Sequence, residues 1–160
     1  MQVFDASSII HAWDNYHIRQ FPGLWEWMAE QICEKQIVMP SVAFDEVDNK
    51  TPECAAWLKD NKIEQLSVTN AIIQKALVIK NLLGIVGDIY HPNGVGENDI
   101  LIIATACVNN LGLVSDEGWQ PKPPVIPKKS KIPLVCTMDV VAVTCINFIE
   151  FIKRSDVVFG

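Results

Sequence analysis

The sequence predicts an α/β fold, a three-layer α/β/α sandwich with a mostly parallel central sheet. Short apolar runs typical of buried strands alternate along the chain with segments in which apolar residues recur every three or four positions. Strands separated by helices pair in parallel and are covered by helices on both faces. The chain has 160 residues, of which 49% are hydrophobic, and this suits a single domain over residues 1–160 with a sizeable core.

The first part of the chain predicts a strand followed by two helices. Val3 and Phe4 form a short buried strand, and Ser7 or Ser8 caps a helix that starts at Ile9. A second helix follows Phe21-Pro-Gly, with one apolar stripe made by Leu24, Trp27, Met28 and Ile32.

A second strand and two further helices come next. Ile37–Met39 is an apolar run closed by Pro40, and Ser41 caps a helix that continues through Val47. Pro52 opens another helix, which ends at Asp60-Asn61.

The middle of the chain predicts a peripheral strand, a longer helix and a loop. Residues Lys62–Val68 form an edge strand or an extended linker. Thr69 or Asn70 caps the helix, which Gly84 stops. Residues Gly84–Gly96 form a loop that contains neither a dinucleotide-binding glycine fingerprint nor a P-loop.

The last part of the chain alternates helices and strands around a second loop. Glu97-Asn98-Asp99 opens the helix Ile100–Asn109, with Asn98 as its cap, and Leu111–Val114 is the next strand. The expected elements after that strand are a proline- and lysine-rich surface loop (118–131), a turn of helix (Ile132–Cys136), a last strand (Val140–Val143) and a last helix (Ile146–Lys153).

Composition and charge restrict the class of protein. The net charge of −6 and the pI near 5.0 exclude a protein-wide positive field, so a polyanionic substrate would need metal ions or a local basic patch. The five scattered cysteines form no C-x-x-C pair, and no export signal precedes the first strand. The apolar run Ile100–Val108 is too short to span a bilayer. We expect a cytoplasmic protein with reduced thiols.

Acidic residues follow the strands or begin the helices at several distant positions. Asp5, Glu46, Asp99 and the pair Asp116/Glu117 all lie just past a strand or in the first turns of a helix. Strand ends of one polarity share one rim of a parallel sheet, so these carboxylates are expected to converge. Converging carboxylates repel one another, and a hard cation such as Mg²⁺ or Mn²⁺ would make the cluster tolerable.

Such an ion suits phosphodiester hydrolysis. Two metals about 3.5–4 Å apart can activate a water and hold the leaving oxygen of an in-line displacement, and one acid can take a proton from that water. The three histidines (His11, His17 and His91) show no metal-ligand spacing.

Four segments carry a resemblance to a known family. They are Val3-Phe4-Asp5-Ala6-Ser7-Ser8, Pro40-Ser41-Val42-Ala43-Phe44-Asp45-Glu46-Val47, Asn98-Asp99-Ile100-Leu101-Ile102-Ile103-Ala104-Thr105-Ala106 and Leu113-Val114-Ser115-Asp116-Glu117. The chain resembles the PIN-domain nucleases, and most closely the VapC-like toxin ribonucleases. The resemblance implies a PIN-like fold and a Mg²⁺- or Mn²⁺-dependent endoribonuclease that is the toxin of a toxin–antitoxin pair.

The resemblance also assigns roles to individual residues. It implies that Asp5, Glu46, Asp99 and Glu117 bind the metal, with Asp116 as a competitor for the fourth position. Ser7 and Ser115 match hydroxyl residues that position ligands or a metal-bound water, and Asn98 supports the start of its helix. The long segment 118–131 and the Glu at position 117, where Asp or Asn is frequent, depart from the family pattern.

Partners follow from the basic residues and from the resemblance. Lys122, Lys128, Lys129 and Lys131 form either a solvated loop or a clamp for the RNA backbone. The resemblance implies an RNA substrate, a cognate antitoxin and a homodimer. Three tryptophans belong either to the core or to a partner surface: Trp13, Trp25 and Trp57.

Two other functions remain open from the sequence. In the first, the protein is a non-catalytic PIN-like interaction module whose acids are helix caps and turn formers. In the second, it is a haloacid-dehalogenase-like phosphatase, which needs a second Asp two residues after the first, where this chain has Ser7.

Overall fold

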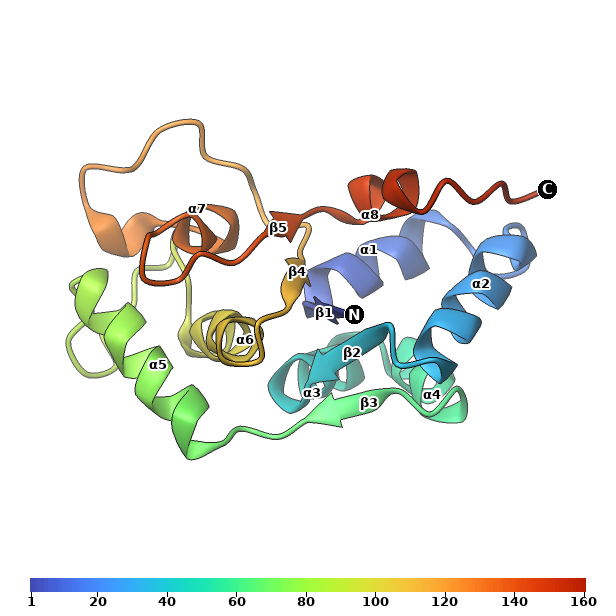
Figure 1. Cartoon of the computed structure of the whole chain (residues 1–160), viewed down its shortest axis with the longest axis horizontal. Helices are drawn as coiled ribbons and strands as arrows, with labels where there is room; N and C mark the ends of the chain where they lie inside the picture. The colour runs from blue at the N-terminus through green and yellow to red at the C-terminus, as the bar shows by residue number, and fades with distance from the viewer.

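The fold is built on one parallel five-stranded sheet. The computed structural model describes all residues from Met1 to Gly160, and its strands lie in the order β3-β2-β1-β4-β5 (Figure 1). The strands are β1 (Gln2–Phe4), β2 (Ile37–Pro40), β3 (Glu64–Leu66), β4 (Gly112–Val114) and β5 (Cys145–Ile146). Every neighbouring pair is parallel, so the sheet is wholly parallel where a mostly parallel one was predicted.

Eight α-helices and one 3₁₀ turn accompany the sheet. They are α1 (Ala6–Asn15), α2 (Pro22–Cys33), α3 (Ser41–Lys50), α4 (Pro52–Asp60), α5 (Asn70–Leu82), α6 (Glu97–Val108), η1 (Pro127–Lys129), α7 (Ile132–Cys136) and α8 (Phe148–Ser155). None of them is both long and apolar enough to cross a lipid bilayer.

Burial along the strands shows that both faces of the sheet are covered. Val3 and Phe4 are successive residues of β1, so their side chains point to opposite faces, yet each is 0% exposed. Leu113 and Val114 of β4 are also 0% exposed. Helices therefore pack on both sides of the sheet, which confirms the predicted three-layer α/β/α architecture.

The order of the strands places a crevice beside β1. The chain runs from β1 to β2 and β3 on one side, and later adds β4 and β5 on the other side. Val3 pairs with Val38 of β2 and with Leu113 of β4, so β1 lies at the centre. Ligands of open α/β sheets bind at the carboxyl ends of the strands where the order reverses, here between β1 and β4. Asp5 and Ser115 follow these two strands directly.

The first helix begins earlier than predicted. It starts at Ala6, immediately after the extended Asp5, so Ser7 and Ser8 lie inside the helix and do not cap it. Ser8 Oγ instead donates to two carbonyl oxygens, those of Asp5 and Val114, at 2.7 and 3.1 Å. This serine joins the start of α1 to the end of β4.

Two other predicted caps are also wrong. Ser41 is the first residue of α3 and makes no capping hydrogen bond. α6 begins at Glu97 after Gly96, so Asn98 lies within its first turn; Asp99 at the third position accepts from the Gly96 N–H. An acid at that position satisfies the N–H of the residue before the helix, here Gly96, whereas a capping side chain would accept from N–H groups of the first turn.

The predicted last strand is wrong, and the last helix begins at Phe148, two residues later than predicted. Val140–Val143 forms a turn in which Ala142 has a φ of +48°, and the strand that extends the sheet is β5. Val141 and Val143 are buried, and this burial accounts for the apolar pattern of Val140–Val143 although the segment does not pair with a strand. The edge strand β3, the Thr69 cap of α5 and the short helix α7 agree with the predictions.

The loop between α5 and α6 packs against the loop between β4 and α7. Val95 N–H donates to the Ser130 carbonyl at 2.9 Å. Within the loop 118–131, the side-chain amide of Gln120 bridges to the far end of the loop. It donates to the Lys129 carbonyl at 3.1 Å and accepts from Lys131 N–H at 2.7 Å. A Cβ on Gly94 would lie 1.9 Å from the Lys128 carbonyl oxygen, so glycine permits this close approach.

The tryptophans of α1, α2 and α4 form an internal cluster. Trp25 is 2% exposed, and its ring centroid lies 5.3 Å from that of Trp13 and 4.9 Å from that of Trp57. Of the two expectations for these residues, the core is the one that the structure supports. All five cysteines are free thiols, and Cys33 is exposed.

Gly94→Ala should separate the two loops. The added Cβ meets backbone, which cannot move aside as a flexible side chain does, so we expect a loss of about 2 kcal/mol in unfolding free energy, or about 4–8 °C in Tm. Gly23→Ala is the control, because its Cβ would only reach ordinary contact distance at 3.8 Å. Differential scanning calorimetry of both variants measures the effect, and an unchanged Tm for Gly94→Ala would contradict the packing described above.

Candidate functional site

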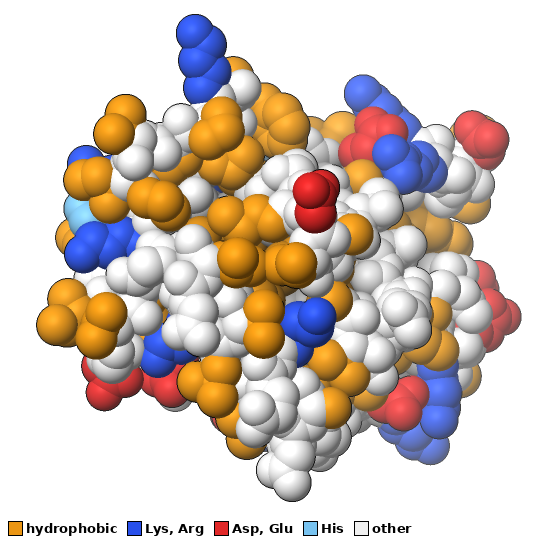
Figure 2. Space-filling view, turned by 60° about the vertical axis from the view of Figure 1, so that its left-hand side comes forward, with side chains coloured by type: hydrophobic (Ala, Val, Ile, Leu, Met, Phe, Trp, Pro, Cys, Tyr) orange, Lys and Arg blue, Asp and Glu red, His pale blue; other side chains and the backbone are white.

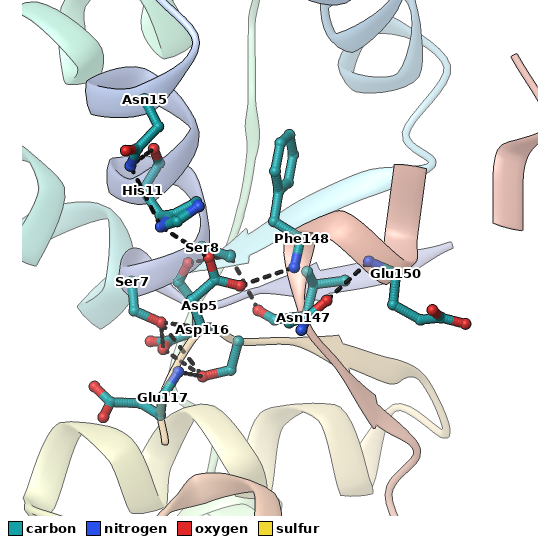
Figure 3. A network of polar contacts seen from close by, with 12 residues as sticks. Asp5, Ser7, Ser8, His11, Asn15, Asp116, Glu117, Asn147, Phe148 and Glu150 are labelled. Carbon is teal, nitrogen blue, oxygen red and sulfur yellow. Dashed lines mark hydrogen bonds and ion pairs between the residues drawn. The ribbon is translucent and has the colours of Figure 1, made fainter. Parts of the chain in front are cut away.

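A buried carboxylate lies at the carboxyl end of the central strand. Asp5 is 2% exposed, and its Oδ2 accepts two hydrogen bonds, from Ser7 Oγ at 2.6 Å and from Ser115 Oγ at 2.9 Å (Figure 3). Its Oδ1 accepts no hydrogen bond from the protein, and no buried side-chain oxygen or nitrogen lacks a partner. Oδ1 is therefore the oxygen of Asp5 that remains free to bond to a ligand.

The two serines connect the ends of β1 and β4. Each also accepts a backbone N–H, Ser7 Oγ from Asp116 at 3.0 Å and Ser115 Oγ from Glu117 at 3.2 Å. The serines thus hold Asp5 in one orientation and also fix the backbone that carries the next two acids.

Two further acids come from the helices α3 and α6. Asp99 uses Oδ2 to accept from Gly96 N–H at 2.9 Å, which fixes its side chain at the start of α6. Glu46 is half-buried on α3, and its Oε1 lies 2.6 Å from Lys50 Nζ one turn later. Glu46, Asn98 and Asp99 line the same hollow. Residues more than fifty positions apart in sequence are thus brought to one place.

The structure separates Asp116 from Glu117. Asp116 Oδ1 accepts from the Phe148 N–H at 2.8 Å and Oδ2 lies 3.4 Å from His11 Nδ1, so this carboxylate joins the start of α8 to α1 (Figure 3). Glu117 makes no side-chain hydrogen bond and lines a hollow with Asp99 and Lys131. Of the two candidates, Glu117 is the one that lies with the other acids.

The charges of these acids act on one another. Burial raises the pKa of Asp5 from 3.8 to about 6, the hydrogen bonds from Ser7 and Ser115 lower it, and the charges of Asp99 and Glu46 raise it again. Loss of hydration also raises the pKa of Asp99, with a contribution from Glu117, and that of Glu117, with a contribution from Asp5. The predicted convergence of carboxylates on this rim is therefore present in the folded chain.

The donor set fits a hard divalent cation in its chemistry. All four candidates offer carboxylate oxygens, the ligands that Mg²⁺ and Mn²⁺ prefer, and Asp5 Oδ1 is free to coordinate. No three Asp, Glu, His or Cys side chains already meet at one point in ion-binding geometry. Binding would draw the carboxylates together and would compete with Lys50 for Glu46.

Basic residues at the site differ in part from those predicted. Lys131 lies beside Glu117 and its charge lowers the pKa of that carboxyl, whereas Lys122 is exposed in the loop and Lys128 and Lys129 belong to η1. Sequence reasoning missed Lys50, whose i,i+4 spacing from Glu46 on α3 was the available signal.

Comparisons with known proteins agree with this fold. The sequence matches, over residues 2–159, the profile of a family described as a domain of unknown function (DUF4411). No curated protein matches it. The chain is similar to a chain in the crystal structure of VapBC2 from Rickettsia felis bound to a DNA fragment from their promoter, with a TM-score of 0.54 and 17% identity over 92% of this chain and 98% of that one. The likeness confirms the PIN-like fold that the sequence resemblance implied.

Asp5 should destabilise the protein at neutral pH when no metal is added. Because folding raises the pKa of Asp5 from 3.8 to about 6, the folded state binds the proton more tightly, and stability falls as the pH rises through this range. The unfolding free energy of Asp5→Asn relative to wild type should therefore increase by about 2–3 kcal/mol between pH 4 and pH 7.

Urea unfolding in EDTA at both pH values measures this difference. Asp45→Asn, an exposed acid on α3, is the control and should differ from wild type equally at both pH values. A pH-independent difference for Asp5→Asn would mean that Asp5 is not held in a protonation-sensitive environment.

Proposed function

The chain belongs to the DUF4411 family, and from this premise we propose that it is a metal-dependent endoribonuclease, the toxin of a toxin–antitoxin pair. The observation that carries the proposal is the gathering of Glu46, Asp99 and Glu117 around the buried carboxylate of Asp5, at the carboxyl edge of the sheet. Neutral side chains could fill a structural role at these positions without repelling one another. A function that needs negative charge therefore explains why acids are present there.

Each acid has a proposed role in the reaction. Asp5, Glu46, Asp99 and Glu117 would hold Mg²⁺ or Mn²⁺. Such an ion supplies an activated water and neutralises charge on the phosphate. Ser7 and Ser115 keep Asp5 Oδ2 occupied, so that Oδ1 faces the site.

The substrate we propose is RNA held mainly through its backbone. Lys131 lies in the hollow that contains Asp99 and Glu117, where its ammonium can pair with a phosphate oxygen. Lys122, Lys128 and Lys129, on the same loop, would extend this attraction along the strand. Since the net charge is −6, binding should depend on these lysines and on the cation, and should weaken steeply with salt.

The partner we propose is an antitoxin that covers an apolar surface on α5 and the loop after it. Six of its hydrophobic side chains are between 43% and 75% exposed: Ile73, Leu77, Val78, Leu82, Val86 and Ile89. Figure 2 shows hydrophobic side chains gathered on the face of the molecule turned toward this side. The solved VapBC2 assembly, to which the fold is similar, supports a protein partner of this class. A homodimer and a cytoplasmic location stay predictions.

Two observations favour the alternative, a non-catalytic PIN-like interaction module. Glu46 is ion-paired with Lys50, and the acids do not already meet in ion-binding geometry. In that alternative the cluster would bind Mn²⁺ no better than an ordinary pair of surface carboxylates.

RNA cleavage by point variants tests the proposal. In Mn²⁺ or Mg²⁺, Asp99→Asn should abolish cleavage and Glu117→Gln should slow it at least about 100-fold, because each removes a charge that holds the ion. Asp116→Asn should slow it less than about 10-fold, because the Asp116 carboxylate is engaged with the start of α8 and with His11. Mapping of RNA 5′ ends in a gel assay gives the rates; undiminished cleavage by folded Asp99→Asn would reject the proposal.

Binding of Mn²⁺ provides a readout that does not depend on finding the right RNA. Wild type should bind Mn²⁺ in isothermal titration calorimetry, and Asp99→Asn should bind at least about tenfold more weakly, since it loses one ligand charge but keeps the acceptor for Gly96 N–H. Asp45→Asn should bind as wild type does. Equal weak binding by all three proteins would favour the interaction module.

A further inference from the structure

A third hollow opens beside the acids, on the side of β5 and α8. Its volume is about 390 Å³, within the range of small-ligand pockets. Ser115 and Glu117 belong to its wall, so it adjoins the carboxylate cluster directly. The remaining wall combines apolar side chains, among them Trp119, Ile146 and Ile149, with the Asn147 amide and the charged groups of Glu150 and Lys153.

Trp119 is unlike every other tryptophan in the chain. It is 71% exposed, and its ring has no aromatic neighbour, whereas Trp13, Trp25, Trp27 and Trp57 each pack on other rings. A large flat apolar ring left in water at the rim of a pocket costs free energy that a stacked ligand would recover.

A free cation lies in the same pocket. Lys153 makes no ion pair, whereas the neighbouring Arg154 is paired with Glu150 at 3.0 Å. The Asn147 Oδ1 caps α8 by accepting from Glu150 N–H, and its amide nitrogen remains free to donate. The pocket thus offers one ring face, one ammonium and one amide donor, a combination that suits a base attached to a phosphorylated sugar.

Three hollows at the site adjoin one another. The first contains Glu46 and Asp99, the second contains Asp99, Glu117 and Lys131, and the third is the Trp119 pocket, which again includes Glu117. Shared residues join each hollow to the next: Asp99 belongs to the first two, and Glu117 to the second and third. An RNA strand whose scissile phosphate lies at the acids would have the Trp119 pocket beside it, because Glu117 lines both hollows.

We propose that this pocket binds the base of an unpaired nucleotide adjoining the scissile phosphate, stacked on Trp119, with Lys153 beside the following phosphate. The inference rests on the proposed ribonuclease function and adds to it a substrate class, single-stranded or looped RNA. In a duplex each base is already stacked and paired, so it could enter the pocket only after being unstacked. Stacking on an aromatic ring is tolerant of base identity, so the pocket selects unpaired structure more than sequence.

The test compares Trp119→Ala and Trp119→Phe with Val125→Ala, a fully exposed residue of the same loop. Trp119→Ala should raise KM for a short single-stranded RNA about tenfold with kcat changed less than about threefold, as expected from the loss of one base–aromatic stack. Trp119→Phe should recover most of the affinity, and Val125→Ala should match wild type. Far-UV circular dichroism melting confirms that the variants are folded.

A binding arm uses Asp99→Asn, which cannot cleave. Fluorescence anisotropy should show tighter binding of a single-stranded oligonucleotide than of the same oligonucleotide with one abasic position, and Trp119→Ala should remove that difference. If wild type cleaves RNA but Trp119→Ala leaves KM and the abasic difference unchanged, the pocket assignment is overturned and the ribonuclease function stands. If wild type neither binds nor cleaves RNA, the proposed function itself fails.

Discussion

The site depends on one buried carboxylate that the fold holds in place against its own unfavourable environment. Asp5 has lost nearly all contact with water, and two other acids raise its pKa further. Hydrogen bonds from Ser7 and Ser115 partly compensate for this burial and orient the group. Because both serines also bind the backbone after β4, the position of Asp5 and the path of Asp116 and Glu117 depend on the same few contacts.

This arrangement gives neighbouring acids different tasks. Asp116 bonds to the first N–H of α8 and approaches His11 on α1, so it keeps two helices in register with the end of β4. Glu117, one residue later, has no such bond and lies with Asp99. The hydrogen bond of Asp116 to Phe148 N–H and the place of Glu117 beside Asp99 thus let one acid support the fold while the next takes part in the cluster.

Positive charge at the site comes from local residues, because the protein as a whole is acidic. Lys50 pairs with Glu46, and its own pKa is raised first by that hydrogen bond and also by the charges of Glu117 and Asp5. Lys131 offsets part of the charge on Glu117 from the other side. Both ammonium groups stabilise the acids in the absence of a metal, and a metal would have to displace the first of them from Glu46.

The sequence by itself determined the order of elements, the parallel sheet and the acids that gather at its edge. Apolar runs that alternate with helical patterns indicate buried strands. In a parallel sheet with right-handed crossovers, all strand ends of one polarity lie on one rim, so distant residues such as Asp5 and Asp99 could be assigned to the same site from the sequence. The same reasoning failed for Val140–Val143, because an apolar pattern records burial and not hydrogen-bond pairing.

Only the tertiary structure decided which atoms do what. It turned Ser7 and Ser8 from helix caps into partners of Asp5 and Val114, distinguished Asp116 from Glu117, and placed Trp119 beside the acids through a loop that has no periodic pattern. These outcomes depend on side-chain directions and on contacts between segments more than a hundred residues apart. Local sequence carries no record of such contacts, since they arise only when the strands β1 and β4 lie side by side.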